Sequence, residues 1–166
     1  MFVPFNELPA DARVWIYPMS RSADTGEVSI IESKLFEFCK QWSAHGFPLK
    51  ASFCVRHSHF VILALDEGAG DASGCAIDSS VRVFKFLQQQ TGIDFMDRTQ
   101  SAFWVENQVV LFPNSKLKEL FEVGTLMATT PAFNNLIDRK GDLDANWVRP
   151  ASQTWLARYI TKGSLV

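Results

Sequence analysis

Six consecutive apolar residues, Phe60–Leu65, constrain this chain more than any other stretch. A strand that faces water on one side alternates apolar and polar residues, whereas an uninterrupted apolar run of this length is typical of a strand buried on both faces. Residues 49–55 do alternate, and the polar turn 56–59 separates them from the apolar run. We therefore expect an antiparallel hairpin whose second strand is central in its sheet.

A glycine-rich loop follows the apolar run and leads into a helix. Gly68, Gly70 and Gly74 leave the backbone free to turn, and Gly92 ends the helix that begins near Gly74. Such a junction is a common place for a binding site, because the first turn of a helix offers unpaired N–H groups. It is also a common plain connection between two elements.

Two elements are expected before this hairpin. Residues 14–17 form a strand, and residues 27–44 form a helix with one buried face. Asp24 and Glu27 have the spacing of a helix cap, and His45-Gly46 is expected to close the helix because glycine tolerates a left-handed turn.

The elements expected after the second helix are another hairpin, at 102–105 and 109–112, a short helix near 117–121 and a last helix that begins at Pro150. The order of elements matches a split β-α-β plan. We therefore expect one α+β domain over residues 1–166, with an antiparallel or mixed sheet, a ferredoxin-like core and C-terminal helical segments.

Composition excludes several classes of function. The 166 residues are 47% hydrophobic and 20% charged, with a net charge of −2 and no concentration of Lys and Arg that would favour nucleic acid. No apolar run would span a bilayer, and the start of the chain lacks a basic segment followed by an apolar one, so we expect a cytoplasmic protein. Cys39, Cys54 and Cys75 are odd in number and lack metal-ligand spacing, so reduced thiols are expected.

The run 72–82, Ala-Ser-Gly-Cys-Ala-Ile-Asp-Ser-Ser-Val-Arg, resembles a segment shared by a family of short, uncharacterised bacterial proteins. The resemblance covers nearly the whole chain, and its other segments are 2–5, 13–17, Trp42-x-x-His45-Gly46, 133–136 and Trp147-x-x-Pro150-Ala151. Members often carry the label "ABC transporter ATPase", which implies a nucleotide-related role. The phosphate loop of such ATPases needs G-x-x-x-x-G-K-[ST], whereas residues 68–74 contain no lysine and include Asp71.

A helix that begins near Gly74 places Cys75, Asp78, Ser79 and Arg82 on one face. One interpretation is a solvated polar face with an ion pair between Asp78 and Arg82. The other is a small binding site, in which the helix dipole favours the Cys75 thiolate. The acidic residues of the loop before the helix would oppose that effect.

A cysteine nucleophile needs a base. We expect His57 and His59 to be out of reach of Cys75, because the whole apolar strand separates them and its ends are about 20 Å apart at ~3.3 Å per residue. His45 leads into the partner strand of an antiparallel pair, so we expect His45 and Cys75 to share one rim of the sheet. The alternative interpretation of His45 is a helix C-terminal residue that the dipole favours.

Four carboxylates in and after the loop, Asp66, Glu67, Asp71 and Asp78, could instead hold Mg²⁺ or Ca²⁺. Their spacing lacks an EF-hand pattern, and a solvated acidic loop explains them without a metal, so neither a metal nor any other cofactor is expected.

The first hypothesis for function is a domain without catalysis that binds a small molecule or a protein partner. The residues expected to bind are Asp71, Asp78, Ser79 and Arg82, beside His45 and Cys75. The alternative is an enzyme with Cys75 as nucleophile and His45 as base.

Overall fold

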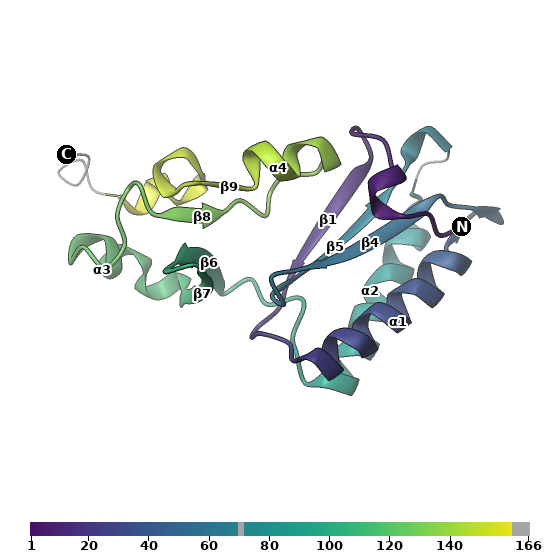
Figure 1. The fold of residues 1–166 in the computed structure, drawn as a ribbon, viewed down its shortest axis with the longest axis horizontal. Helices are drawn as coiled ribbons and strands as arrows, with labels where there is room; N and C mark the ends of the chain where they lie inside the picture. Colours follow the sequence, from purple (N-terminus) through teal and green to yellow (C-terminus); the bar gives the residue numbers. More distant parts are fainter. Residues whose placement is uncertain (70–71, 161–166) are drawn as a thin grey trace.

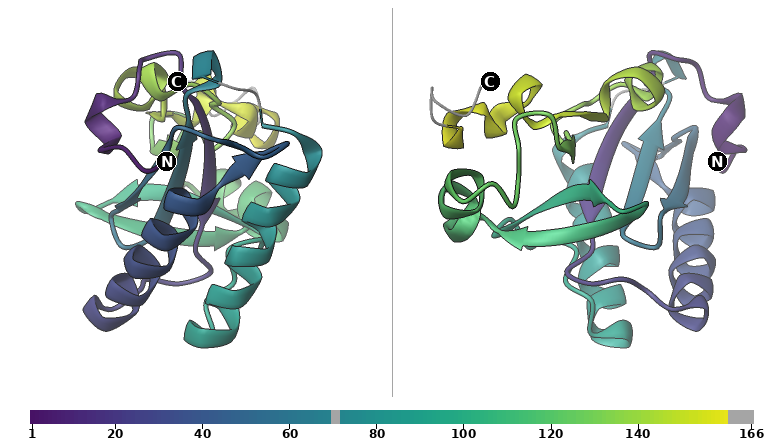
Figure 2. Two further views of the ribbon diagram at one scale, coloured as in Figure 1. Left: turned by 90° about the vertical axis from the view of Figure 1, so that its right-hand side faces the viewer. Right: turned by 60° about the vertical axis from the view of Figure 1, so that its left-hand side comes forward.

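A computed structural model describes residues 1–69 and 72–160 and shows a three-stranded and a four-stranded sheet packed against each other (Figure 1). Two long helices cover the free face of the first sheet, and short helices cover the far side of the second (Figures 1 and 2). The chain is therefore an α+β protein. None of its described helices is long and apolar enough to cross a membrane.

The first sheet has the order β1-β5-β4, with β1 at Arg13–Pro18, β4 at Ala51–Arg56 and β5 at Phe60–Leu65. β5 pairs antiparallel with both neighbours, and each of its residues is 0% exposed. The prediction of a central strand buried on both faces is confirmed.

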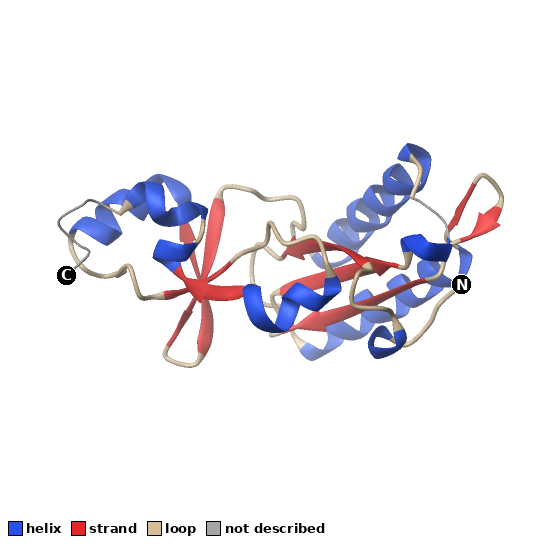
Figure 3. Ribbon diagram, turned by 90° about the horizontal axis from the view of Figure 1, so that it is seen from above, coloured by secondary structure: helices blue, strands red, loops and turns tan. Residues whose placement is uncertain are grey.

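Helices α1 (Thr25–Gln41) and α2 (Gly74–Thr91) lie side by side on one face of this sheet (Figure 3). A capping box starts α1: Asp24 Oδ1 accepts from the backbone N–H of Glu27, and Glu27 Oε2 accepts from the N–H of Asp24. Gly92 ends α2 with a φ of 70°, a conformation that glycine adopts without steric cost. The start of α1 and the end of α2 agree with the sequence prediction.

The prediction that His45-Gly46 closes the first helix is wrong. The helix ends at Gln41, and a small hairpin follows, with β2 at Ser43–Ala44 and β3 at Phe47–Pro48. His45 and Gly46 have φ values of 52° and 82° and form the hairpin turn. A two-residue hairpin turn and a helix stop both use positive φ, so the local sequence fits either structure.

The ferredoxin-like prediction is not confirmed, although β1, α1 and β4 do form a split β-α-β unit around β5. The hairpin that would supply a fourth strand, β6 (Gln100–Val105) and β7 (Gln108–Pro113), belongs to a second sheet. That sheet has the order β7-β6-β8-β9 and includes β8 (Pro131–Phe133) and β9 (Val148–Pro150).

The C-terminal part contains the expected short helix near 117–121 but not the expected last α-helix. Helix α3 spans Leu117–Glu122 and α4 spans Leu143–Asn146, while the expected last helix consists of two 3₁₀ segments, Ala151–Gln153 and Trp155–Tyr159. Pro150 ends β9 instead of opening an α-helix. Further 3₁₀ turns are Phe5–Glu7, Glu67–Ala69, Asn114–Lys116 and Lys140–Asp142.

The two sheets meet through a cluster of aromatic rings. Phe60 packs against Phe133 and Trp147, with ring centroids 4.7 and 5.0 Å apart. His57, in the turn between β4 and β5, lies against Trp104 at 4.8 Å and extends this cluster. The turn of the central hairpin is therefore part of the contact between the sheets.

Ser52 in β4 is 0% exposed, and its hydroxyl has no hydrogen-bond partner among the described residues. Because a buried unpaired hydroxyl costs free energy, Ser52→Ala should leave the free energy of unfolding unchanged or raise it by up to about 1 kcal/mol. Ser101→Ala is the matched control, since Ser101 Oγ donates to Asn114 Oδ1 at 2.6 Å, and it should lower stability by about 1 kcal/mol. Urea unfolding measures both, and an equal loss in the two variants would contradict the prediction.

Burial lowers the pKa of His57 from its ordinary value of 6.5, and the nearby Arg56 and His59 lower it further. The unfolded chain then takes up this proton at a higher pH than the folded chain, so stability should fall as the pH drops through about 6.5. His57→Asn should reduce the change in unfolding free energy with pH around 6.5. Asparagine is chosen because it tolerates the positive φ of residue 57. His59→Asn is the control and should retain the change; equal slopes in the two variants would contradict the assignment.

Candidate ligand-binding cavity

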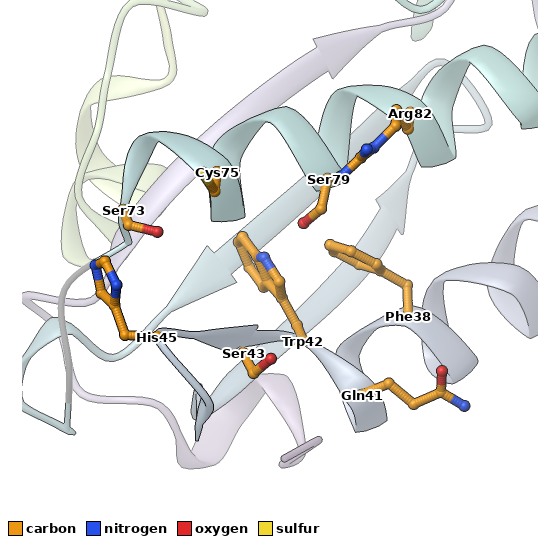
Figure 4. A pocket seen from close by; sticks show the side chains of 9 residues that line it. All are labelled: Phe38, Gln41, Trp42, Ser43, His45, Ser73, Cys75, Ser79 and Arg82. Atoms are coloured by element: carbon orange, nitrogen blue, oxygen red, sulfur yellow. The ribbon is translucent and has the colours of Figure 1, made fainter.

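A cavity of about 420 Å³ opens between the end of α1, the β2–β3 hairpin and the first turns of α2 (Figure 4). We refer to it as the α1–α2 cavity. Its lining residues come from all three elements and are Phe38, Gln41, Trp42, Ser43, His45, Ser73, Cys75, Ser79 and Arg82.

Two aromatic rings form one wall of the cavity. Trp42 and Phe38 lie 4.9 Å apart, and both extend from the end of α1 toward α2 (Figure 4). The indole N–H of Trp42 donates to the backbone oxygen of Ala76 at 3.0 Å, which fixes the ring against the start of α2. Trp42 is only 3% exposed, so this wall is a rigid part of the core.

The opposite wall is the beginning of α2. Ser73 caps the helix by accepting from the N–H of Ala76, and the Ser79 hydroxyl donates to the Ala76 oxygen at 2.6 Å. Cys75 lies in the first turn, is exposed and points toward the cavity (Figure 4). The backbone N–H groups of Gly74 and Cys75 precede the first N–H that the helix engages, so the helix itself leaves them unpaired.

The polar ends of the cavity are His45 and Arg82 (Figure 4). His45 lies beside Ser73 at one end, carried by the hairpin turn, and Arg82 lies at the other end on α2. Both side chains are exposed. Together with the aromatic wall, this arrangement can hold a flat apolar group and hydrogen-bond a polar group at either end.

The structure brings together four of the six residues that the sequence singles out as a site: His45, Cys75, Ser79 and Arg82 all line the α1–α2 cavity. No hydrogen bond joins Cys75 to His45 in the described part of the chain. Asp78 is exposed outside the lining, and the expected ion pair between Asp78 and Arg82 is absent from the described contacts. Asp71 lies outside the described residues.

The face of α2 that meets the core includes one polar residue, Ser80. Ala76, Ser80, Phe84 and Leu87 are buried, whereas Ile77 and Val81 are only half-buried. Ser80 can take an inner position because its hydroxyl donates to the oxygen of Ile77, which leaves no unpaired group.

Asp66 and Glu67, which precede α2, are engaged in ion pairs. Asp66 lies 3.2 Å from Lys50 and accepts from the N–H of Gly68, while Glu67 bridges Arg13 and Arg139 at 3.3 and 3.2 Å. The described residues contain no group of three side chains that would hold a metal ion. These carboxylates therefore fasten the start of the loop to the first sheet and to Arg139.

The sequence analysis predicts none of Gln41, Ser43 and Ser73 as site residues, and the helical spacing of Phe38 and Trp42 fits the buried face of the first helix. Helical spacing identifies which residues leave the solvent, and it cannot separate a core contact from a cavity wall. The segment Trp42-x-x-His45 carried the one available signal, an aromatic residue beside a polar turn.

A scan of protein-family models, a search of curated proteins and a search of solved structures each find no match to this chain. The function of the chain must therefore be inferred from the geometry and chemistry of the cavity.

Exposure predicts the order in which the three thiols react. Burial raises the pKa of Cys39 to about 12 and also raises the pKa of Cys54, whereas Cys75 is exposed. Because the thiolate is the reactive form, iodoacetamide at neutral pH should label Cys75 first, as mass spectrometry of digested protein would show. Cys75→Ser should abolish the rapid labelling by iodoacetamide. Rapid labelling of Cys39 in the folded protein would contradict the burial.

Proposed function

We propose that this protein binds a small organic molecule in the α1–α2 cavity and performs no reaction on it. The observation that carries the proposal is the convergence of an aromatic wall and two polar ends, from three separate elements, on one open cavity. Its volume of about 420 Å³ lies within the range of ~300–1,000 Å³ that is usual for ligand pockets.

The lining favours a flat ligand with an anionic end. Phe38 and Trp42 offer ring surface, while Arg82 and His45 supply basic side chains, and none of the described lining residues carries a carboxylate. An arginine recognises a carboxylate or phosphate through paired hydrogen bonds. An aromatic carboxylate combines both features and is the ligand class that we propose.

A Cys75-dependent enzyme with His45 as base is the second candidate, because the cavity contains both residues. A reactive cysteine of this kind needs a lowered pKa. The rate of Cys75 alkylation against pH separates the two candidates: a midpoint near the ordinary thiol value removes the enzyme, and a midpoint well below it favours the enzyme.

The nucleotide-related role rests on the family resemblance alone, and thermal shift with ATP and Mg²⁺ tests it.

The binding proposal is tested with indole carboxylates as probes and indole amines of equal size as their controls. The carboxylates should shift the NMR signal of the Trp42 indole N–H, and the amines should not. Arg82→Gln should weaken binding about tenfold, which corresponds to ~1.4 kcal/mol. Lys85→Gln removes a cation from the same helix outside the cavity and should leave binding unchanged.

Ser43→Trp provides an independent check, because a large side chain at this exposed lining position should fill the cavity without disturbing the core. It should abolish binding while the unfolding midpoint stays close to that of the wild type. Binding that survives Ser43→Trp, or equal affinity for carboxylates and amines, would overturn the proposal.

A further inference from the structure

Strand β1 is an edge strand whose outer side is covered only at its beginning. The N–H of Val14 donates to the oxygen of Asp138 at 2.8 Å, and the N–H of Lys140 donates to the oxygen of Ala12 at 2.9 Å. Arg13 and Arg139 form an isolated antiparallel bridge between these bonds. Residues 138–140 thus start a fourth strand beside β1 and extend it no further.

The chain before Asp138 turns away from β1. The amide group of Asn134 organises this turn, since its Oδ1 accepts from the N–H of Leu136, and the side chain of Asn135 accepts from the indole N–H of Trp147. A slot of about 440 Å³ remains between the two segments. We refer to it as the β1 slot; residues 13–17, Arg98 and residues 135–138 line it.

The backbone of β1 offers hydrogen-bonding groups to this slot. Successive residues of a strand direct their N–H and C=O groups to opposite sides, and Val14 already bonds outward to Asp138. Ile16 therefore points its N–H and C=O outward too, and no backbone bond outside the sheet engages it in the described residues. Pro18 has no N–H, which limits the usable edge to a few residues.

The charge of the slot selects the partner. Arg98 is exposed at the end near Tyr17 and forms no ion pair with any described residue, whereas Arg13 at the other end is paired with Glu67. Asp138 is the one acidic residue of the described lining, and it lies at the end that is already paired with β1. An acidic side chain is therefore favoured near Arg98.

We propose that the β1 slot binds an extended acidic peptide segment of a partner protein, which pairs with Ile16 and completes the first sheet as a fourth strand. A second copy of the chain fits this edge less well. Pairing through its own β1 would bring a second Arg13 and Arg98 to an edge that already carries these cations. This site is separate from the α1–α2 cavity and does not depend on the function proposed there.

The test starts with selection of displayed random peptides on the full-length protein. Selected peptides should be enriched in Asp and Glu and should slow hydrogen exchange of the Ile16 amide. N-methylation of alternate peptide amides should abolish binding, because it removes donors and leaves the side chains in place. Absence of acidic enrichment, or binding that leaves exchange at Ile16 unchanged, would overturn the proposal.

Arg98→Gln should weaken the selected acidic peptides about tenfold. Arg158→Gln, which removes an exposed arginine outside the slot, is the matched control and should not change their affinity. Circular dichroism confirms that each variant is folded. Equal affinity of the two variants would overturn the charge argument, and protection of Ile16 that rises with protein concentration in the absence of peptide would replace the partner by a second copy.

Discussion

Burial of β5 is the constraint on which the rest of the structure depends. Its six residues are fully buried, so each backbone group on both edges must find a partner in a neighbouring strand. β1 and β4 supply those partners, both antiparallel. Because β4 and β5 run in opposite directions, the hairpin that precedes β4 and the helix that follows β5 lie at the same end of the sheet. The α1–α2 cavity forms where they meet.

Local chemistry was sufficient to predict the central strand, the cap at Asp24, and the beginning and end of α2. Each depends on a few neighbouring residues: the central strand depends on the apolar run 60–65, and the end of α2 depends on the positive φ of Gly92. The shared location of His45 and Cys75 was also predictable, since it follows from the antiparallel pairing alone. The sheet to which the β6–β7 hairpin belongs was not predictable, because a hairpin has the same local sequence pattern in either sheet. The pairing of β6 with β8 places the hairpin in the second sheet, and this pairing joins residues about thirty positions apart in the chain (Phe103 and Ala132).

The error at His45 has a similar origin. A polar residue before glycine after a helical stretch fits a helix stop and a tight turn equally well, and the pairing of Ala44 with Phe47 selects the turn. The error has a consequence for the site. A helix C-terminus would hold His45 beside backbone carbonyls, whereas the hairpin turn places it at the mouth of the cavity next to Ser73.

The cavity and the β1 slot share a structural element. Trp15 lines the slot, and its ring packs against Trp42, a wall of the cavity, at 6.1 Å. Both proposed sites are therefore lined by a member of one pair of indole rings. Any coupling between the sites must be reciprocal, because each ligand can change the affinity of the other only by the same factor. This contact between two indole rings joins the end of α1 to strand β1 at the open edge of the sheet.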